Sequence, residues 1–158
     1  MLCLSRKAAV LVVDDDDAIR KTLAKILVRD GYFVEGVESG KEAIEASKRC
    51  FFNVALIDFR LPDMEGTRLL ERLKETEPKM AKIIITGYPS LKNAIEAVNK
   101  NADGYVLKPF DPGELLAMIT RLLEKQRKNA KYSEEKVLEF IETRVKQLEL
   151  EKWKKRAC

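Results

Sequence analysis

The amino-acid sequence predicts an α/β protein, with a doubly wound parallel sheet followed by a C-terminal helical extension. Short runs of Val, Ile and other apolar residues, typical of strands buried on both faces, alternate with segments whose apolar residues recur every three or four positions, as in helices. Strands and helices that alternate in this way form parallel sheets with right-handed crossovers. The 158 residues suffice for one well-buried domain and a further segment.

The first predicted elements are the apolar strand AAVLVV at 8–13, a helix at 18–29 and a weaker strand at 32–37. The helix has apolar residues at helical spacing and ends at the turn pair Asp30-Gly31. Asp17 is placed to cap its N-terminus, since a carboxylate accepts hydrogen bonds from the free N–H groups of a first turn.

A helix at 39–50 follows, and Ser39 with Glu42 has the spacing of a capping box at its start. The run NVALI at 53–57 predicts the third strand. A turn-rich segment then leads to a helix at 67–76, with leucines on its inner face.

The run MAKIII at 80–85 predicts the fourth strand, 91–100 a short helix, and DGYVL at 103–107 the fifth strand. Asp111, followed by Pro in the first turn and by Glu114, starts the fifth helix. The residues that this helix is expected to bury are Leu115, Leu116, Met118, Ile119, Leu122 and Leu123.

Charged and hydroxyl side chains follow four of the five strands at their carboxyl ends. Asp14 and Asp15 follow the first strand, Asp58 the third, Thr86 the fourth and Lys108 the fifth. In the flavodoxin-like strand order 2-1-3-4-5 these strands are neighbours, and such sheets bind ligands beyond their carboxyl ends. We therefore expect three carboxylates, a hydroxyl and an ammonium group in one shallow site.

These groups have a coherent chemistry. Clustered carboxylates beside apolar residues repel one another, and a hard divalent cation, Mg²⁺ for a small open oxygen site, offsets the repulsion. An Asp carboxylate is a competent nucleophile towards phosphorus. Phosphoryl transfer also needs a cation and a hydrogen-bond donor on the phosphoryl oxygens, which Lys108 and Thr86 supply. None of these steps needs His, which the chain lacks.

The segments LVVDDDD, ALIDFRLPDMEG, IIITGYP and DGYVLKPF, in this order and spacing, resemble the receiver domain of two-component response regulators over roughly residues 8–125. The resemblance implies that Asp58 accepts a phosphoryl group from the phosphohistidine of a histidine kinase acting in trans. It also implies that Asp15 binds Mg²⁺ directly, Asp14 binds it through water, and the backbone carbonyl of Arg60 is a further ligand.

The resemblance further implies a conformational switch. Thr86 would move to hydrogen-bond the acyl phosphate, Lys108 would pair with it, and Tyr105 would turn inward. The Lys108–Pro109 bond is expected to be cis. Taken by themselves, the residues leave Thr86 open as a cap of the next turn and Tyr105 as ordinary core.

Two other positions also have alternatives. Asp14 or Asp15 by itself could be a helix cap, although Asp58 and Lys108 favour the metal site. The side chain of Arg60 is expected near the path of an attacking water, where it would set the lifetime of the phosphoryl group.

We place the receiver domain at 5–127 and a linker with an amphipathic helical extension at 128–158. The polar segment EKQRKNAKYS at 124–133 indicates a frayed helix end and a linker. A second, amphipathic helix starts at Ser133. Its apolar residues repeat over only two heptads, too few to identify a coiled coil, so we expect it to dock on its own receiver or on a partner. Its apolar stripe consists of Leu138, Ile141, Val145 and Leu148.

The net charge of the chain lies in this tail. Residues 1–123 have 19 basic and 19 acidic side chains, whereas 124–158 have 11 and 7, which gives the whole formal charge of +4. We therefore do not expect DNA as the main partner. The alternative is a DNA-binding transcriptional regulator that acts through the basic C-terminal helix. Steep salt dependence of duplex binding, lost on deletion of 133–158, would support it.

Composition excludes several other classes. No apolar run approaches the roughly 20 residues that span a bilayer, and the opening MLCLSRKAA is too short and charged for a signal peptide, so we expect a cytoplasmic protein with no membrane contact. Three unclustered cysteines, Cys3, Cys50 and Cys158, are expected to be inert thiols, and without His they argue against zinc.

The remaining rival is an enzyme that uses the acidic site on an external phosphoester, of flavodoxin-like or phosphatase-like type. Against it, no Gly-rich loop follows the first strand, and Arg60 stands where a second Asp would be needed. We expect a signalling switch that catalyses only its own phosphoryl transfer and dephosphorylation. Its output is expected to be a homodimer through the face of the fourth helix, fifth strand and fifth helix, or an unidentified partner protein.

Overall fold

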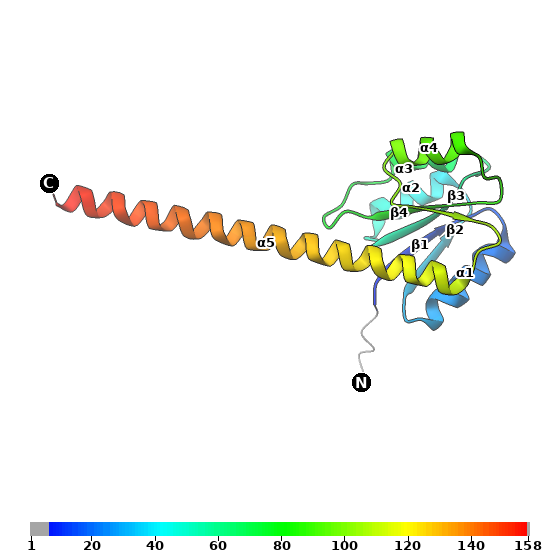
Figure 1. The fold of residues 1–158 in the computed structure, drawn as a ribbon, viewed down its shortest axis with the longest axis horizontal. Coiled ribbons are helices and arrows are strands. Elements are labelled where there is room, and N and C mark those ends of the chain that lie inside the picture. The colour runs from blue at the N-terminus through cyan, green and yellow to red at the C-terminus, as the bar shows by residue number, and fades with distance from the viewer. Residues whose placement is uncertain (1–6, 158) are drawn as a thin grey trace.

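Five strands alternate with five helices in the computed structural model, which describes residues 7–157 (Figure 1). Of the cysteines, Cys50 is exposed and free, whereas Cys3 and Cys158 lie outside the described residues, as does most of the opening segment MLCLSRKAA. In chain order the elements are β1 (Ala9–Val13), α1 (Asp17–Arg29), β2 (Phe33–Val37), α2 (Gly40–Arg49), β3 (Val54–Asp58), α3 (Gly66–Arg72), β4 (Ala81–Thr86), α4 (Leu91–Asn99), β5 (Gly104–Leu107) and α5 (Pro112–Arg156).

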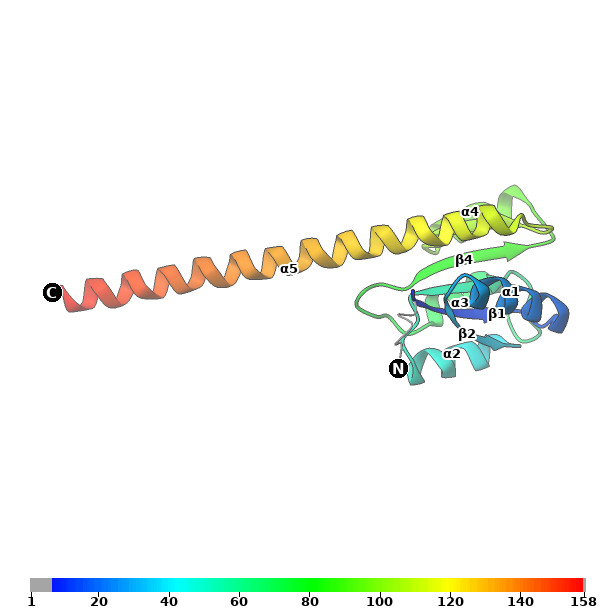
Figure 2. The same cartoon turned by 90° about the horizontal axis from the view of Figure 1, so that it is seen from below.

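The strands form one parallel sheet in the order β2-β1-β3-β4-β5, which confirms the predicted topology. One hydrophobic core lies between the sheet and α2, α3 and α4, and the other lies between the sheet and α1 and the first part of α5. Figure 1 shows α2, α3 and α4 on one side of the sheet and α1 and the start of α5 on the other, and Figure 2 shows the length of α5 that extends beyond the strands. Because β1, β3 and β4 are covered on both faces, their side chains are almost all buried, as the continuous apolar runs indicated.

Side chains cap most of the helices where the sequence predicted. The Ser39 hydroxyl accepts a hydrogen bond from the N–H of Glu42, and the Asp111 carboxylate accepts one from the N–H of Gly113. The prediction for α1 is wrong by one residue. Asp16 is its N-cap and accepts hydrogen bonds from the second and third N–H groups of the helix, because its backbone is extended and that of Asp17 is already helical.

Helix α3 ends at Arg72, earlier than the predicted 67–76. Leu73 has an extended backbone, and the next N–H, that of Lys74, donates to the hydroxyl of buried Ser47 on α2 at 3.2 Å. A tertiary hydrogen bond therefore replaces the helical one. Periodicity within the segment does not contain that information.

Helix α5 is continuous for 45 residues and passes through 124–133, where we predicted a frayed end and a linker. That segment contains neither Gly nor Pro and consists mainly of good helix formers, so low apolar content alone does not interrupt the helix. We predicted that the tail docks on its own receiver or on a partner. The first alternative is wrong, since residues 133–157 are exposed and project away from the domain (Figure 1), and the second stays a prediction. Among residues 7–157, no helix combines the length and the apolar character needed to cross a membrane.

Gln126 is the last residue of α5 that is buried, and its side chain joins the helix to the domain. Its amide nitrogen donates to the carbonyl oxygens of Asn53 and Lys79 at 3.1 and 2.7 Å, and its amide oxygen accepts from the Asn53 side chain at 3.1 Å. Sequence analysis assigned this residue to a polar linker. The signal that could have found it is its place one turn after the buried leucines of α5.

Candidate functional site

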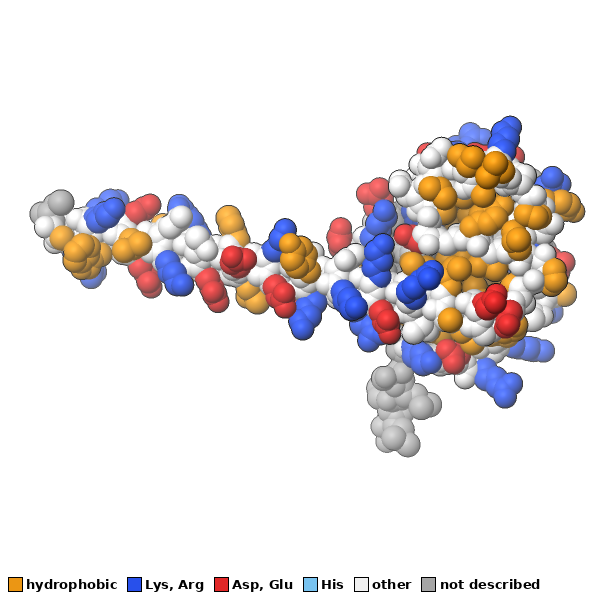
Figure 3. All heavy atoms as spheres, viewed as in Figure 1, with side chains coloured by type: hydrophobic (Ala, Val, Ile, Leu, Met, Phe, Trp, Pro, Cys, Tyr) orange, Lys and Arg blue, Asp and Glu red, His pale blue; other side chains and the backbone are white. Residues whose placement is uncertain are grey.

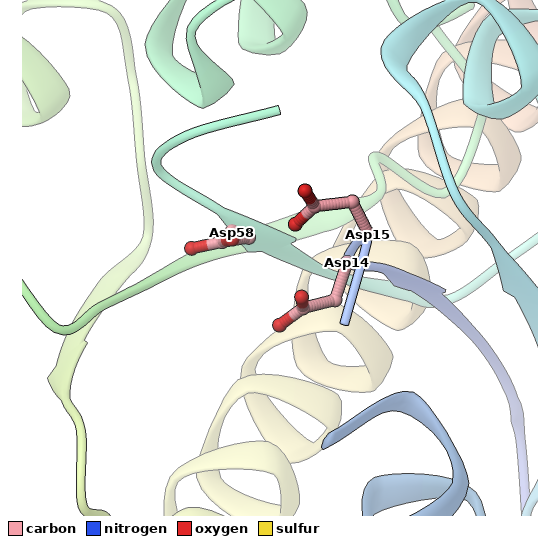
Figure 4. Close-up of side chains that lie close together, drawn as sticks. All are labelled: Asp14, Asp15 and Asp58. Atoms are coloured by element: carbon pink, nitrogen blue, oxygen red, sulfur yellow. The ribbon is translucent and has the colours of Figure 1, made fainter. Parts of the chain in front are cut away.

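Three carboxylates gather at the carboxyl ends of β1 and β3 (Figure 4). Asp14 and Asp15 follow β1, and Asp58 is the last residue of β3. One oxygen from each lies within 4.8 Å of the others. Asp14 is buried, with 3% of its surface exposed, Asp58 is partly buried and Asp15 is exposed, so the cluster spans the boundary between core and solvent.

Lys108 reaches this cluster from the end of β5. Its Nζ lies 3.0 Å from Oδ2 of Asp14 and 3.3 Å from Oδ1 of Asp58. The N–H of Lys108 donates to the carbonyl oxygen of Thr86, and the following bond to Pro109 is cis, as expected. The structure therefore brings together Asp14, Asp15, Asp58 and Lys108, whereas Thr86 meets Lys108 through its backbone carbonyl.

Burial and charge act against each other at this site. Burial raises the pKa of the Asp58 carboxyl, the charge of Asp14 raises it further, and Lys108 only partly opposes the rise. Burial by itself would lower the pKa of the Lys108 ammonium, but its hydrogen bond to Asp14 and the two negative charges outweigh burial and raise it. Lys108 is therefore held as a cation between two carboxylates.

The donor set fits a hard divalent cation. Three carboxylates offer oxygen atoms only, at mutual distances that one ion can bridge, and two of them already surround a positive group. Mg²⁺ prefers oxygen ligands and takes only one or two carboxylates directly, which leaves room for water and phosphoryl oxygens. An acidic cluster of this composition can therefore hold Mg²⁺ with Asp14, Asp15 and Asp58.

Thr86 and Tyr105 lie on the neighbouring strands. Thr86 is 1% exposed, and its hydroxyl oxygen accepts a hydrogen bond from the N–H of Tyr88 at 3.0 Å, which is the local turn contact that the sequence left open. Tyr105 is partly buried against the core, and its hydroxyl is buried with no hydrogen-bond partner among residues 7–157. An unpaired buried hydroxyl costs free energy, so it destabilises the present position of the Tyr105 ring.

Arg60 lies two residues after Asp58, on the surface beside the site. Its guanidinium carbon is 4.2 Å from the centre of the Tyr88 ring, a cation–π contact that sequence analysis did not predict. The backbone of Arg60 also contributes a hydrogen bond that lowers the pKa of Asp58. Its side chain is thus held against the β4–α4 loop at Tyr88.

Gly66, the first residue of α3, permits the chain after Asp58 to fold back tightly. Its N–H donates to the carbonyl oxygen of Phe59 at 2.6 Å, and a Cβ on Gly66 would overlap with the backbone carbonyl oxygen of Asp58. Since that oxygen belongs to the sheet, it cannot move aside as a flexible side chain would. Gly66 therefore sets the position of the loop that borders the acidic cluster.

Substitution Gly66→Ala is expected to lower the free energy of unfolding by about 1–3 kcal/mol, the usual cost of overpacking. Denaturant titration followed by circular dichroism measures it. Gly87→Ala is the matched control, because a Cβ there meets only ordinary contacts with the Lys108 side chain. Equal stabilities for the two variants would contradict this role of Gly66.

Asp63 links the loop after β3 to α2. Its carboxylate accepts hydrogen bonds from the N–H groups of Gly40 and Lys41, each at 2.9 Å, so it caps a helix that precedes it by more than twenty residues. Slight burial acts to raise the pKa of Asp63, but these hydrogen bonds outweigh it and lower the pKa. The sequence predicted only a turn-rich segment here, because a cap from another segment leaves no local pattern.

Comparison with known proteins gives a consistent result. The family model of the response regulator receiver domain matches residues 10–120. A CheY-like receiver domain protein from Methanospirillum hungatei is 44% identical, with a TM-score of 0.73, and the match covers 77% of this chain and 97% of that one. The beryllofluoride-activated NtrC4 receiver domain dimer is 34% identical, with a TM-score of 0.70, and the match covers 75% of this chain and 98% of that one.

Among curated proteins, the DNA-binding transcriptional regulator NtrC of Proteus hauseri is 36% identical over 141 residues, which are 86% of this chain. The regulatory protein AtoC of Escherichia coli is 32% identical over 74% of this chain. The chain spans only 30% and 25% of the lengths of these two relatives. The family match over most of the chain, the sheet order and the acidic cluster beside Lys108 agree, and the chain belongs to the response regulator receiver domain family of two-component signalling.

Proposed function

We propose that this protein is a phosphoacceptor that takes a phosphoryl group from a histidine kinase onto Asp58 in a Mg²⁺-dependent reaction. The observation that supports this best is the position of Asp58. It lies at the end of β3, partly open to solvent, with the carboxylates of Asp14 and Asp15 nearby and the Lys108 ammonium 3.3 Å away. The phosphoryl group then shifts the domain between two conformations that control a dimer or a partner.

The chain's own groups divide the work of the reaction. A carboxylate oxygen of Asp58 forms the new bond to phosphorus as the bond to the kinase imidazole nitrogen breaks. Lys108 neutralises charge on the phosphoryl oxygens, and its contacts with Asp14 and Asp58 hold its ammonium in place before the donor arrives. Asp15, Asp14 through water, and the Arg60 carbonyl would hold Mg²⁺, which when bound stabilises charge on the transferred group.

The switch begins at Thr86. Its hydroxyl oxygen accepts a hydrogen bond from the N–H of Tyr88, which does not use the hydroxyl proton. Thr86 can therefore donate that proton to a phosphoryl oxygen on Asp58, which is a strong, charged acceptor. As Thr86 moves, Tyr105 turns further inward. Its hydroxyl is already buried without a partner among residues 7–157, which destabilises the present position of the ring. The side chain of Arg60, stacked on Tyr88, stands where it would govern access of water to the phosphoryl group.

The output surface is the face of α4, β5 and the start of α5. Leu91, Ile95 and Val98 on α4 and Leu107 on β5 are exposed, and Figure 3 shows hydrophobic side chains gathered between α4 and α5. Patches of this kind mark protein interaction sites, so a homodimer or a partner protein fits this face. Receiver domains are signalling switches. The protein catalyses its own phosphoryl transfer and dephosphorylation, and it acts in the cytoplasm.

DNA binding by the tail is the second candidate function. Residues 124–158 contain the chain's whole excess of basic side chains, and Lys152, Lys154, Lys155 and Arg156 are exposed at the end of α5. The NtrC relatives are named as DNA-binding regulators, although this chain matches only about a third or less of their length.

Intact mass spectrometry after incubation with a small phosphodonor tests the main proposal. We expect a single phosphoryl adduct with Mg²⁺ present and none within the same time in EDTA. Mg²⁺ added back to the EDTA sample must restore the adduct. An adduct that forms equally fast without Mg²⁺, or no adduct under either condition, contradicts the proposal.

A further inference from the structure

Helix α5 presents a stripe of large apolar side chains that no other part of residues 7–157 covers. We name this stripe the tail seam, and it consists of Leu138, Ile141, Val145 and Leu148. These residues are 41–59% exposed, although each would be buried in an ordinary domain. Figure 3 shows hydrophobic side chains along the tail, well away from the globular part.

The spacing of the tail seam is that of a heptad repeat. Its residues follow one another at intervals of three, four and three, which places Leu138 and Val145 at a positions and Ile141 and Leu148 at d positions. Val137 widens the seam at a flanking g position. Lys152 and Lys155 occupy the next a and d positions and end it.

We propose that the tail seam pairs with the same seam of a second copy of this chain, as a parallel, in-register, two-stranded coiled coil. The seam lies beyond Gln126, the last residue that α5 buries in the receiver, so the receiver of the same chain does not compete for it. Val at a with Leu at d, as at Val145 and Leu148, favours two strands, whereas Leu at a with Ile at d, as at Leu138 and Ile141, favours three or four strands. We propose two strands on the second heptad, and the mass in solution decides between these states.

Charges beside the seam select the parallel orientation. In a parallel pair, each g residue faces the e residue five positions later on the other helix, which sets Arg144 against Glu149 and Glu151 against Arg156. Both pairs are of opposite charge. In an antiparallel pair with the seam in contact, g residues face g residues and e residues face e residues. Arg144 would then face Arg144 of the other helix, and Glu142, at an e position, would face Glu142 of the other helix. Like charges there disfavour that orientation.

The inference goes beyond the proposed function and does not depend on it, because the seam lies outside the receiver surface and needs no phosphoryl group. Two heptads give a modest association, so the dimer should dissociate on dilution. At the same time, a weak tail contact raises the local concentration of one receiver beside another.

Sedimentation equilibrium of the full chain in EDTA, without phosphodonor, tests the proposal. We expect a mass that rises with concentration from one chain to two. The double substitution I141D/V145D removes the rise, whereas F140D/L150D, which changes apolar residues of the same helix that lie off the seam and are more exposed, leaves it. Circular dichroism confirms that α5 stays helical in both variants.

Three results would overturn the proposed dimer. The first is a monomer at every concentration up to about 1 mM, where even a pairing of ~4 kcal/mol would be visible. The others are a mass above two chains and a dimer that persists in I141D/V145D. Orientation is tested separately by charge reversal. R144E and E149R should each weaken the parallel dimer, and the combination should restore it. An antiparallel dimer would not be restored by the combination, and that result would overturn the proposed orientation.

Discussion

Substitution Asp58→Asn will abolish the phosphoryl adduct that the wild-type protein forms with a small phosphodonor and Mg²⁺. An amide oxygen is a far weaker nucleophile than a carboxylate and cannot form the acyl phosphate. The side chain keeps its size, and the sheet register that positions it, Asp58 opposite Ile85, is made by backbone atoms. Intact mass spectrometry of both proteins under identical conditions measures the effect, which is complete loss of the adduct.

Asp16→Asn is the matched control for this variant. It removes the same charge from the same end of the sheet, and Asn caps a helix as well as Asp, so α1 should be preserved. We expect this control to retain the adduct. A phosphoryl group on Asp58→Asn, or its loss from Asp16→Asn, would place the acceptor elsewhere.

Asp58→Asn should also change stability, and here the variant should gain where it loses the phosphoryl adduct. Burial and Asp14 raise the pKa of Asp58 above its unfolded value, so the ionised carboxylate disfavours the folded state at any pH above the raised pKa. In Mg²⁺-free buffer at neutral pH, Asp58→Asn should therefore raise the free energy of unfolding. The gain should shrink as the pH falls through the raised pKa of Asp58, where the wild-type carboxyl becomes neutral. A variant less stable than wild type at neutral pH would contradict this electrostatic account.

The sequence predicted those features that depend on local pattern and strand order. Continuous apolar runs identified buried parallel strands, and the residues after them, Asp14, Asp58 and Lys108, meet because parallel strands end at one edge of the sheet. The nearness of their side chains follows from topology, so no detail of packing was needed to predict it. Their roles in phosphoryl transfer remain predictions, which the Asp58 and Lys108 variants test.

Features made by distant segments could not be predicted in this way. Asp63 caps α2 from another loop, Ser47 takes the hydrogen bond that ends α3, and Gln126 is buried by contacts with residues far away in the sequence. None of these contacts has a period or a spacing. The continuity of α5 was missed for a different reason, since a polar segment with good helix formers remains helical when buried turns nucleate it on one side.

Substitution Lys108→Met is expected to slow phosphorylation roughly a hundredfold, the usual effect of removing one preorganised group that stabilises transition-state charge. Methionine keeps much of the apolar stem and removes only the ammonium group. The rate of adduct formation, followed by intact mass over time at saturating Mg²⁺, measures the loss. An unchanged rate would mean that Lys108 neutralises its carboxylate neighbours and takes no part in the transfer.

The free energy of unfolding of Lys108→Met, measured with and without Mg²⁺, distinguishes the role of the Lys108 charge from that of its packing. Without the ammonium, Asp14 is a buried carboxylate with no cation beside it, so Lys108→Met should lose roughly 1–3 kcal/mol of unfolding free energy in Mg²⁺-free buffer. Added Mg²⁺ should restore most of that loss, because it supplies positive charge to the same carboxylates.

Lys82→Met is the matched control, since the Lys82 ammonium is also partly buried on the sheet but donates to the Leu70 carbonyl, away from the acidic cluster. Its phosphorylation rate should equal that of wild type, and Mg²⁺ should change its stability no more than it changes that of wild type. If Mg²⁺ restored neither variant or both equally, the loss at position 108 would be one of packing.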